Sequence, residues 1–270
     1  MQTADCDLDL QTSADAVALG QAAFAHVRTG DYAAARPLLD RALALNPRSP
    51  MLAHTMAHLT GDSGALEEGA AFMRSFLAND DPAHGLHAHN SWHLASMEME
   101  LGRPAAALEL YMRAVGPRVA ELPMTFFSAV SLLWMLELNG YGTSGGAGNA
   151  TLPWEELRDV ALTLDTKSAL EQVGRAMSFI GAGDDNGLES LLNRLREDST
   201  EQDTMQAAIT SEVVIPLAMG LRAFHRGDYG AAVALMEPLA QSFARLSTFR
   251  DQLVVFEDTL REAQRRKTLG

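Results

Sequence analysis

Apolar residues recur every three to four positions along most of the chain, the spacing typical of amphipathic helices. Three distant segments are alike: GDYAAARPLLDRALALNP begins at Gly30, GRPAAALELYMRAVGP at Gly102 and GDYGAAVALMEPLAQSF at Gly227. In each, an alanine follows the glycine by five residues and a bulky side chain follows it by nine. Glycine readily adopts the left-handed conformation that ends a helix, and alanine lets neighbouring helices pack closely. The pattern therefore predicts repeated helical hairpins.

A second apolar stretch precedes each glycine, so each repeat has two antiparallel helices in about 34 residues, as in a tetratricopeptide repeat. Less regular helix pairs are expected at 49–59 with 65–77, at 123–138 with 154–164 and at 168–180 with 187–197, before a closing helix at 248–266. The strand-like run SEVVIPL, residues 211–217, is also expected to be helical.

The sequence thus predicts an all-α fold, a tetratricopeptide-like solenoid of helical hairpins curled around a concave pocket. One repeat domain is expected over residues 14–270, after a flexible N-terminus at residues 1–13. The glycine-rich segment NGYGTSGGAGNATLP, residues 139–153, is expected to be a mobile linker or lid. It does not fit a phosphate-binding loop, because no strand precedes it and no Gly-Lys-Ser/Thr follows it.

Composition restricts the partners and the compartment. The 270 residues are 47% hydrophobic, and 35 acidic against 21 basic residues give a net charge of −14. This charge repels phosphate backbones and anionic lipid, so neither nucleic acid nor a membrane surface is expected as a partner. No apolar run approaches the roughly 18 residues that cross a bilayer. With one cysteine, Cys6, and no leader-like start, a cytoplasmic location is expected.

Histidines are the most informative polar residues, and four of the eight lie within HGLHAHNSWH. If the helix-ending glycine is residue fifteen of a repeat, His89 and His93 take positions two and six of a first helix, which face the concave side. In the preceding repeat, with Gly64 as residue fifteen, His54 and His58 take positions five and nine. Each pair is spaced i, i+4 and therefore occupies one helix face.

First helices of consecutive repeats lie about 10 Å apart, so the two pairs are expected to share one wall. Converging imidazoles can bind Zn, Fe, Cu or Ni, or can exchange protons near neutral pH. The candidate metal ligands are His54, His58, His89 and His93. Alternatively, these side chains only form hydrogen bonds at a helix interface. His84 and His87 are expected in the preceding loop, and His26 and His225 in structural roles.

A carboxylate is also available for acid–base chemistry. In HTMAH, Thr55 stands where zinc proteases with an HExxH motif carry their glutamate, so that mechanism is not expected. Glu100 lies further along the helix of His89 and His93 and is near the same face. His89, His93 and Glu100 are therefore the candidate catalytic residues.

Aromatic residues predict a pocket wall. With Gly140 as residue fifteen of the next repeat, Ser131 and Trp134 face the concave side, beside Trp92 of the previous first helix. Aromatic side chains can line a small-molecule pocket. Tryptophan at helical spacing is more often part of a packed core, and the sequence leaves both interpretations open.

Four segments, LAHTMAHL, HNSWHLASMEMELGRPAAALELY, SLLWMLELNG and GDYGAAVALMEPLAQSF, resemble in this order the tetratricopeptide repeat protein 38 family. The likeness covers residues 16 to about 263, and the chain resembles a divergent, shortened member without the N-terminal helices of longer members. It implies the repeat fold and identifies as motif residues His54, His58, His89, Asn90, Trp92 and His93. Asn90 and Trp92 thereby join Ser131 and Trp134 as candidate substrate-pocket residues.

The chain also departs from this family. Ser128 replaces a family aspartate, Met135 replaces an arginine, and STFRDQLV replaces a C-terminal GGSHAQRD motif. The histidine motifs are kept while the C-terminal polar residues are lost. Either the site has specialised towards its histidines, or it is decaying into a scaffold.

Two functions follow. The first is a small-molecule-binding protein or enzyme with a histidine-lined site, dependent on a transition metal or on histidine alone; a lyase, cyclase, oxidase or hydrolase fits equally. The second is a non-catalytic adaptor that binds a peptide or protein partner in its groove. Neutral histidines and the net charge favour a basic or apolar segment over an acidic tail. Self-association into a homo-oligomer through the apolar groove is a further option.

Overall fold

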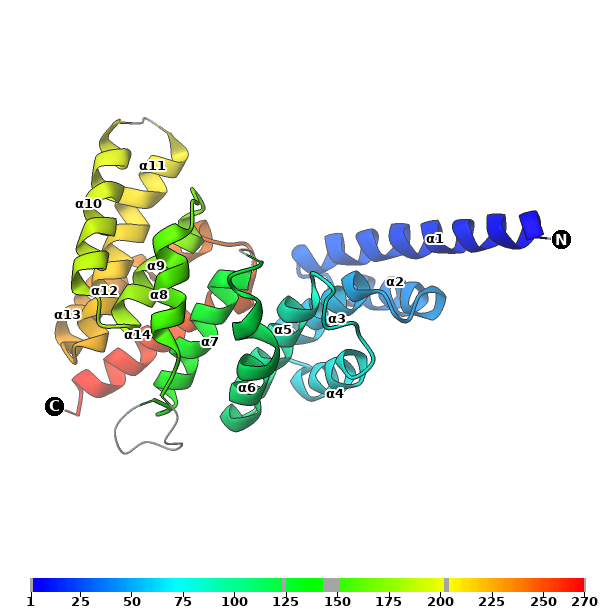
Figure 1. Ribbon diagram of the computed structural model, residues 1–270, viewed down its shortest axis with the longest axis horizontal. Coiled ribbons are helices and arrows are strands. Elements are labelled where there is room, and N and C mark those ends of the chain that lie inside the picture. Colours follow the sequence, from blue (N-terminus) through cyan, green and yellow to red (C-terminus); the bar gives the residue numbers. More distant parts are fainter. Residues whose placement is uncertain (1, 123–124, 143–150, 202–203, 270) are drawn as a thin grey trace. The chain divides into compact units, whose positions relative to one another are not determined.

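The structure, a computed structural model, describes residues 2–122, 125–142, 151–201 and 204–269 (Figure 1). The regular structure in these ranges is helical and includes no strand, which confirms the predicted all-α helical repeat fold. The chain divides into two compact units, Met1–Gly116 and Pro117–Gly270. The boundary falls before a proline, which lacks the amide hydrogen needed to continue an α-helix.

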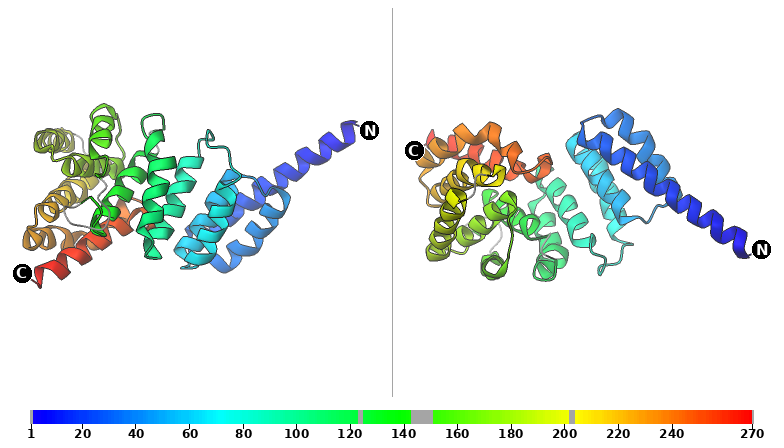
Figure 2. Two further views of the ribbon diagram at one scale, coloured as in Figure 1. Left: turned by 60° about the horizontal axis from the view of Figure 1, so that its bottom comes forward. Right: turned by 90° about the horizontal axis from the view of Figure 1, so that it is seen from above.

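The first unit consists of three helical hairpins. Their helices are α1 (Gln2–Arg28) and α2 (Tyr32–Leu45), α3 (Pro50–Asp62) and α4 (Leu66–Leu77), and α5 (His87–Glu100) and α6 (Pro104–Leu110). The glycine that follows each first helix has a left-handed φ, +74° at Gly30, +78° at Gly64 and +73° at Gly102. The predicted hairpins and turn glycines are therefore confirmed here, and Figure 2 shows α1 and α2 side by side.

Local signals explain where these helices begin. The Asp31 carboxylate accepts a hydrogen bond from the Ala34 amide at 3.2 Å and caps α2. Ser49 caps α3 in the same way, and Pro50 occupies the first helical position, where its missing amide hydrogen costs nothing. The small residues predicted to allow close packing are fully buried between the helices, as at Ala35.

The second unit also contains helical hairpins. Its helices are α7 (Phe126–Leu138), α8 (Trp154–Thr163), α9 (Ala169–Gly181), α10 (Asp185–Glu201), α11 (Met205–Ile209), α12 (Ile215–His225), α13 (Tyr229–Met236) and α14 (Val254–Lys267). Gly140 and Gly227 again have left-handed φ values, and Gly183, which the repeat pattern did not single out, does so between α9 and α10. The less regular helix pairs predicted in this part are present, with α7 described from Phe126.

Some boundaries differ from those expected. Helix α1 begins at Gln2, within the segment expected to be a flexible N-terminus, and the assignment of one repeat domain over residues 14–270 stays a prediction. The closing helix α14 begins at Val254, because a 3₁₀ helix over Glu237–Arg245 and a short one at Arg250–Gln252 come first. Of the glycine-rich loop, residues 143–150 lie outside the described residues.

The expectation about apolar runs needs correction. The predicted helicity of SEVVIPL is confirmed, and it joins α11 to α12 through a π-helical turn at Thr210–Val214. The resulting helical stretch, Met205–His225, has 21 residues and a mean hydropathy of 1.4, enough to span a membrane by length and composition. More than half of it is buried, and α12 packs against α9 and α13 as a core helix of the second unit.

Candidate functional site

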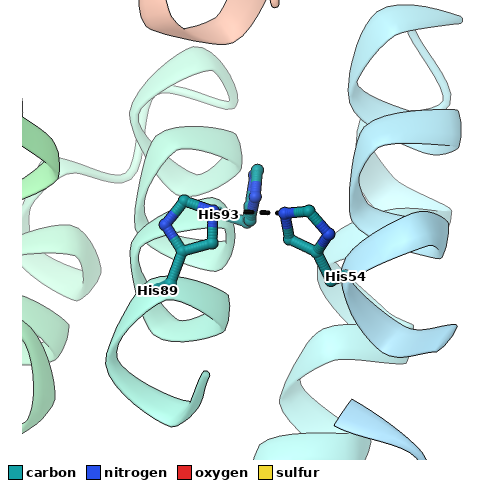
Figure 3. A group of neighbouring side chains, drawn as sticks. All are labelled: His54, His89 and His93. Carbon is teal, nitrogen blue, oxygen red and sulfur yellow. Dashed lines mark hydrogen bonds between the residues drawn. The ribbon is translucent and has the colours of Figure 1, made fainter. Parts of the chain in front are cut away.

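The two predicted histidine pairs meet in the first unit. His54 and His58 lie one turn apart on α3, and His89 and His93 lie one turn apart on α5. These two helices pack against each other, and Figure 3 shows imidazoles from both pointing towards a common centre. The histidine cluster, defined as these four residues, is therefore present as the repeat register predicted.

The imidazole nitrogens approach one another closely. His54 Nε2 lies 3.2 Å from His89 Nε2 and 3.1 Å from His58 Nε2. His93 completes the group, with its ring centroid 4.5 to 5.0 Å from those of His58, His89 and His54. One potential ligand atom each from His54, His89 and His93 lies within 4.8 Å of the others.

This spacing is poorly explained by hydrogen bonds among the histidines alone. A neutral ring nitrogen carries either one hydrogen or one lone pair, so His54 Nε2 cannot form a full hydrogen bond with both neighbours at once. A metal ion accepts a lone pair from every imidazole. Two nitrogens bound at about 2.05 Å to a tetrahedral ion lie about 3.3 Å apart, close to the 3.2 Å between His54 Nε2 and His89 Nε2.

Burial keeps His93 neutral. His58 and His93 are buried, and His54 and His89 are partly exposed. Desolvation, followed by repulsion from His54, holds the pKa of His93 well below its usual 6.5. Protons therefore do not compete for the His93 lone pair near pH 7, which favours metal coordination.

Aromatic rings enclose the cluster within the first unit. Phe24 of α1 lies 5.8 Å from both His54 and His58 between ring centroids. Trp92 stacks on His89 at 5.4 Å with an interplanar angle of 21° and lies 4.8 Å from His93. The cluster therefore has apolar walls, which restrict water and strengthen interactions with any bound ion.

Asn90, another predicted pocket residue, ties the two ligand helices together. Its side-chain amide donates a hydrogen bond to the Pro50 carbonyl at 3.0 Å, which joins the start of α5 to the start of α3. Its Oδ1 is buried and has no hydrogen-bond partner among the described residues. This contact holds the start of α5 against the start of α3, and the role of Asn90 in a substrate pocket stays a prediction.

The other predicted site residues lie elsewhere. Glu100, the last residue of α5, is exposed and lies about 10 Å beyond His93 along the helix axis. Its neighbour Glu98 is the buried carboxylate, paired with Arg74 at 2.9 Å and Arg103 at 3.5 Å. The acid–base role of Glu100 stays a prediction.

Ser131 and Trp134 belong to α7 in the second unit. The Ser131 hydroxyl donates to the Ser128 carbonyl at 3.0 Å, and Trp134 Nε1 donates to Thr259 Oγ1 at 2.9 Å. Both side chains are buried in that unit. Their role in a substrate pocket with Trp92 stays a prediction.

The loop assignment of His87 is wrong. His87 is the first residue of α5, and its Nδ1 lies 2.9 Å from Asp80 Oδ2, with both side chains largely buried. His84 does precede the helix, where it accepts a hydrogen bond from the Leu86 amide at 3.1 Å. His26 is placed 3.3 Å from Asp31, at the turn between α1 and α2.

Sequence reasoning missed a second group of polar residues. Glu137 of α7 is not among the predicted site residues, and His225 is predicted only in a structural role. In the structure, Glu137 Oε2 lies 3.8 Å from His225 Nε2 beside a cavity of the second unit. The available signal was the single carboxylate within FFSAVSLLWMLEL, because an acid in a buried helix needs a partner or a raised pKa.

A family model described as a tetratricopeptide repeat matches residues 16–59. This segment of the first unit is similar to a tetratricopeptide repeat. The match covers the second half of α1, all of α2 and most of α3, so this repeat includes His54 and His58. His89 and His93 lie on the next first helix, beyond the matched residues.

Proposed function

We propose that the first unit binds one transition-metal ion through His54, His89 and His93. The observation that carries this proposal is the convergence of their ring nitrogens within 4.8 Å from two adjacent helices. The 3.2 Å between His54 Nε2 and His89 Nε2 supports it, because this is close to the spacing of two ligands on a tetrahedral ion. Neutral imidazoles suit Zn, Cu, Ni and Fe.

The ion is proposed to keep one coordination position for a small-molecule ligand. Three histidine ligands leave a fourth position to water or substrate, whereas four close the site. His58 lies 3.1 Å from His54 Nε2 but outside the group of three mutually close ligand atoms. His58 is therefore assigned as a neighbouring proton acceptor for metal-bound water. Such an ion can activate water or polarise a carbonyl, which suits a binding protein or an enzyme.

Metal content tests this proposal. Protein purified without an affinity tag, stripped and reloaded with zinc, is expected to hold one ion per chain by elemental analysis. The His54→Ala/His89→Ala variant should hold none, and His58→Ala should retain the ion. The matched control is His26→Ala/His84→Ala, which removes two histidines outside the cluster. Equal zinc in the first variant and the control would rule out the site.

A second candidate function is protein interaction, favoured by the repeat match because tetratricopeptide repeats commonly bind proteins or peptides. An apolar groove of about 140 Å³ lies between α1 and α3, with Val17 and Met51 each 55% exposed beside it. With a chain charge of −14, the partner proposed for this groove is an apolar segment with basic flanks.

Fluorescence anisotropy with a labelled Leu- and Phe-containing peptide flanked by lysines tests the adaptor role. The Val17→Glu/Met51→Glu variant should lose binding at least tenfold, because buried charge opposes apolar contact. Leu162→Glu, an equally exposed apolar position in the second unit, is the control. Binding that survives the double substitution, or a peptide with glutamate flanks that binds equally well, would contradict this role.

Two further assignments are proposals of the same kind. The histidine segments of α3 and α5 support membership of the tetratricopeptide repeat protein 38 family. The single cysteine among 270 residues supports a cytoplasmic location, where thiols stay reduced.

A further inference from the structure

The second unit contains a cavity of about 800 Å³ whose described lining residues all belong to that unit. They come from α7, α8, α9, α12, α13 and α14 and from the turns beside them. We call this cavity the α7–α12 pocket. Its volume falls within the range of small-molecule sites.

Glu137 is the central polar residue of the pocket. Its Oε1 accepts a hydrogen bond from Trp154 Nε1 at 2.6 Å, and its Oε2 lies 3.8 Å from His225 Nε2. The carboxylate is 21% exposed. No lysine or arginine lies within ion-pair distance of Glu137 in the described part of the unit, so its negative charge lacks a permanent counter-charge.

Aromatic side chains line the same pocket as this carboxylate. Trp134 lies 6.3 Å from Trp154 and 6.5 Å from Phe224, and Phe224 lies 5.7 Å from Tyr229, all between ring centroids. Two of these rings contact a cation of the protein itself. The Arg266 guanidinium lies 5.5 Å from the Phe224 ring centroid and 5.4 Å from the Tyr229 ring centroid. Aromatic faces attract cations through their quadrupole.

The arginines of the lining are neutralised by their own carboxylates. Arg226 pairs with Asp185 at 2.6 Å, and Arg266 pairs with Glu262 at 2.6 Å and donates to the Tyr229 hydroxyl at 2.9 Å. Two more acids, Glu155 and Glu156 in the first turn of α8, also line the pocket. The charge that remains for a ligand is therefore negative.

We propose that the α7–α12 pocket binds a small organic cation, an ammonium or guanidinium group attached to an apolar body. Glu137 is the counter-ion and a hydrogen-bond acceptor, and the aromatic residues contact the apolar body. The same cationic group can come from a free amine or from a lysine or arginine side chain of a peptide.

The ionisation of Glu137 makes this binding dependent on pH. Burial raises the pKa of Glu137 to about 7, with the hydrogen bond from Trp154 opposing the shift. Burial also lowers the pKa of His225, so His225 is neutral where Glu137 titrates. The other charged or titratable groups that line the pocket are Arg226, Tyr229 and Arg266 and the acids Glu155 and Glu156. A cation binds the carboxylate form, so its affinity should be about tenfold lower at pH 6 than at pH 8, following the ionised fraction of Glu137.

Calorimetry with 2-phenylethylamine tests the proposal, and 2-phenylethanol is the neutral isostere. The amine is expected to bind with release of a proton at pH 7, and the alcohol at least tenfold more weakly. Glu137→Gln preserves the acceptor for Trp154 but removes the charge, and should weaken amine binding at least tenfold. Glu197→Gln, an exposed acid on α10 away from the pocket, is the matched control and should bind as the parent protein does.

The source of the cation is tested with an acetylated, amidated peptide that carries one lysine, beside the free amine. Tighter binding of either ligand supports the proposal and identifies the source. The proposal is overturned if neither ligand binds, if the alcohol matches the amine, or if Glu137→Gln retains the affinity. Circular dichroism of Glu137→Gln checks that the variant is folded, and Glu137→Asp, which keeps the charge, should restore part of the binding.

Discussion

The histidine cluster and the α7–α12 pocket both take their polar residues from the first helix of a hairpin, but one contains imidazoles and the other a carboxylate. In both units the polar groups come from first helices, those that end at a left-handed glycine: α3 and α5 in one, α7 and α12 in the other. On α3 and α5 the groups are imidazoles within the helix, and their ring nitrogens converge. On α7 and α12, Glu137 and His225 lie at the C-terminal ends, where a carboxylate meets a cavity.

Under these two proposals, helical hairpins of the same kind carry different sites, and the difference lies in the side chains. Side chains i, i+4 on one helix face produce a compact set of ligands when the neighbouring helix repeats the spacing. A single buried acid at a helix end instead needs a cationic ligand to offset the cost of burying its charge. The aromatic residues beside it contact the rest of that ligand. The first arrangement suits a metal ion, and the second suits an organic cation.

The largest expected effect is the response of the first unit to zinc. At a free zinc concentration a thousandfold above the dissociation constant, the free energy of unfolding should rise by about 4 kcal/mol, because the ion binds only the folded cluster. Urea unfolding with and without zinc measures this rise. His54→Ala/His89→Ala should abolish it, while Glu137→Gln should not. A rise that persists in the histidine variant would mean that zinc binds elsewhere.

The change in the free energy of unfolding that Glu137 causes between low and high pH should be nearly as large as the zinc effect, but it is a loss of stability. Its folded pKa of about 7 lies above the ordinary 4.5, so the protonated form stabilises the fold. That contribution is complete below pH 4.5 and is lost as the pH rises through 7, a change of roughly 3 kcal/mol. At pH 8, Glu137→Gln should therefore exceed the parent protein in stability by about this amount.

Urea unfolding of both proteins from pH 5 to pH 8 measures the difference, and Glu197→Gln is the control. A constant difference across this range would show that Glu137 has an ordinary pKa and would remove the pH argument for cation binding.

The hairpins and the histidine cluster could be predicted from the sequence, whereas the α7–α12 pocket could not. Helical hairpins and their turn glycines follow from local periodicity, and the left-handed φ values at Gly30, Gly102 and Gly227 agree with the repeat pattern. The histidine cluster was predictable because register alone places His54 and His89, 35 residues apart, on adjacent first helices.

The repeat register does not bring together the residues of the α7–α12 pocket. Glu137 and His225 are 88 positions apart on helices whose hairpins are not consecutive, so no repeat spacing pairs them. The sequence also does not mark a division at Gly116, because apolar periodicity continues on both sides of it. Likewise, helical periodicity did not distinguish Glu98, which two arginines hold in a buried position, from the exposed Glu100.

A third prediction concerns the packing that shapes the α7–α12 pocket. A Cβ atom at Gly181, the last residue of α9, would overlap the Trp154 ring. Gly181→Ala should therefore cost about 2 kcal/mol of stability and weaken amine binding, with zinc content unchanged. Gly230→Ala in α13, where there is room for the methyl group, should be neutral or slightly stabilising. Urea unfolding and calorimetry measure both. Unchanged amine affinity in Gly181→Ala would show that Trp154 does not shape the site.

The smallest expected effect tests whether a histidine near the cluster can be structural only. His87 lies two residues before His89, yet its Nδ1 pairs with Asp80 instead of the other imidazoles. His87→Ala should cost about 1.5 kcal/mol, the value of one largely buried hydrogen bond to a charged group, and His87→Asn should recover part of it. Zinc content by elemental analysis should stay at one ion per chain in both variants. Loss of zinc in His87→Ala but not in His87→Asn would mean that the Asp80 contact holds the start of α5, and with it His89, in position for the ion.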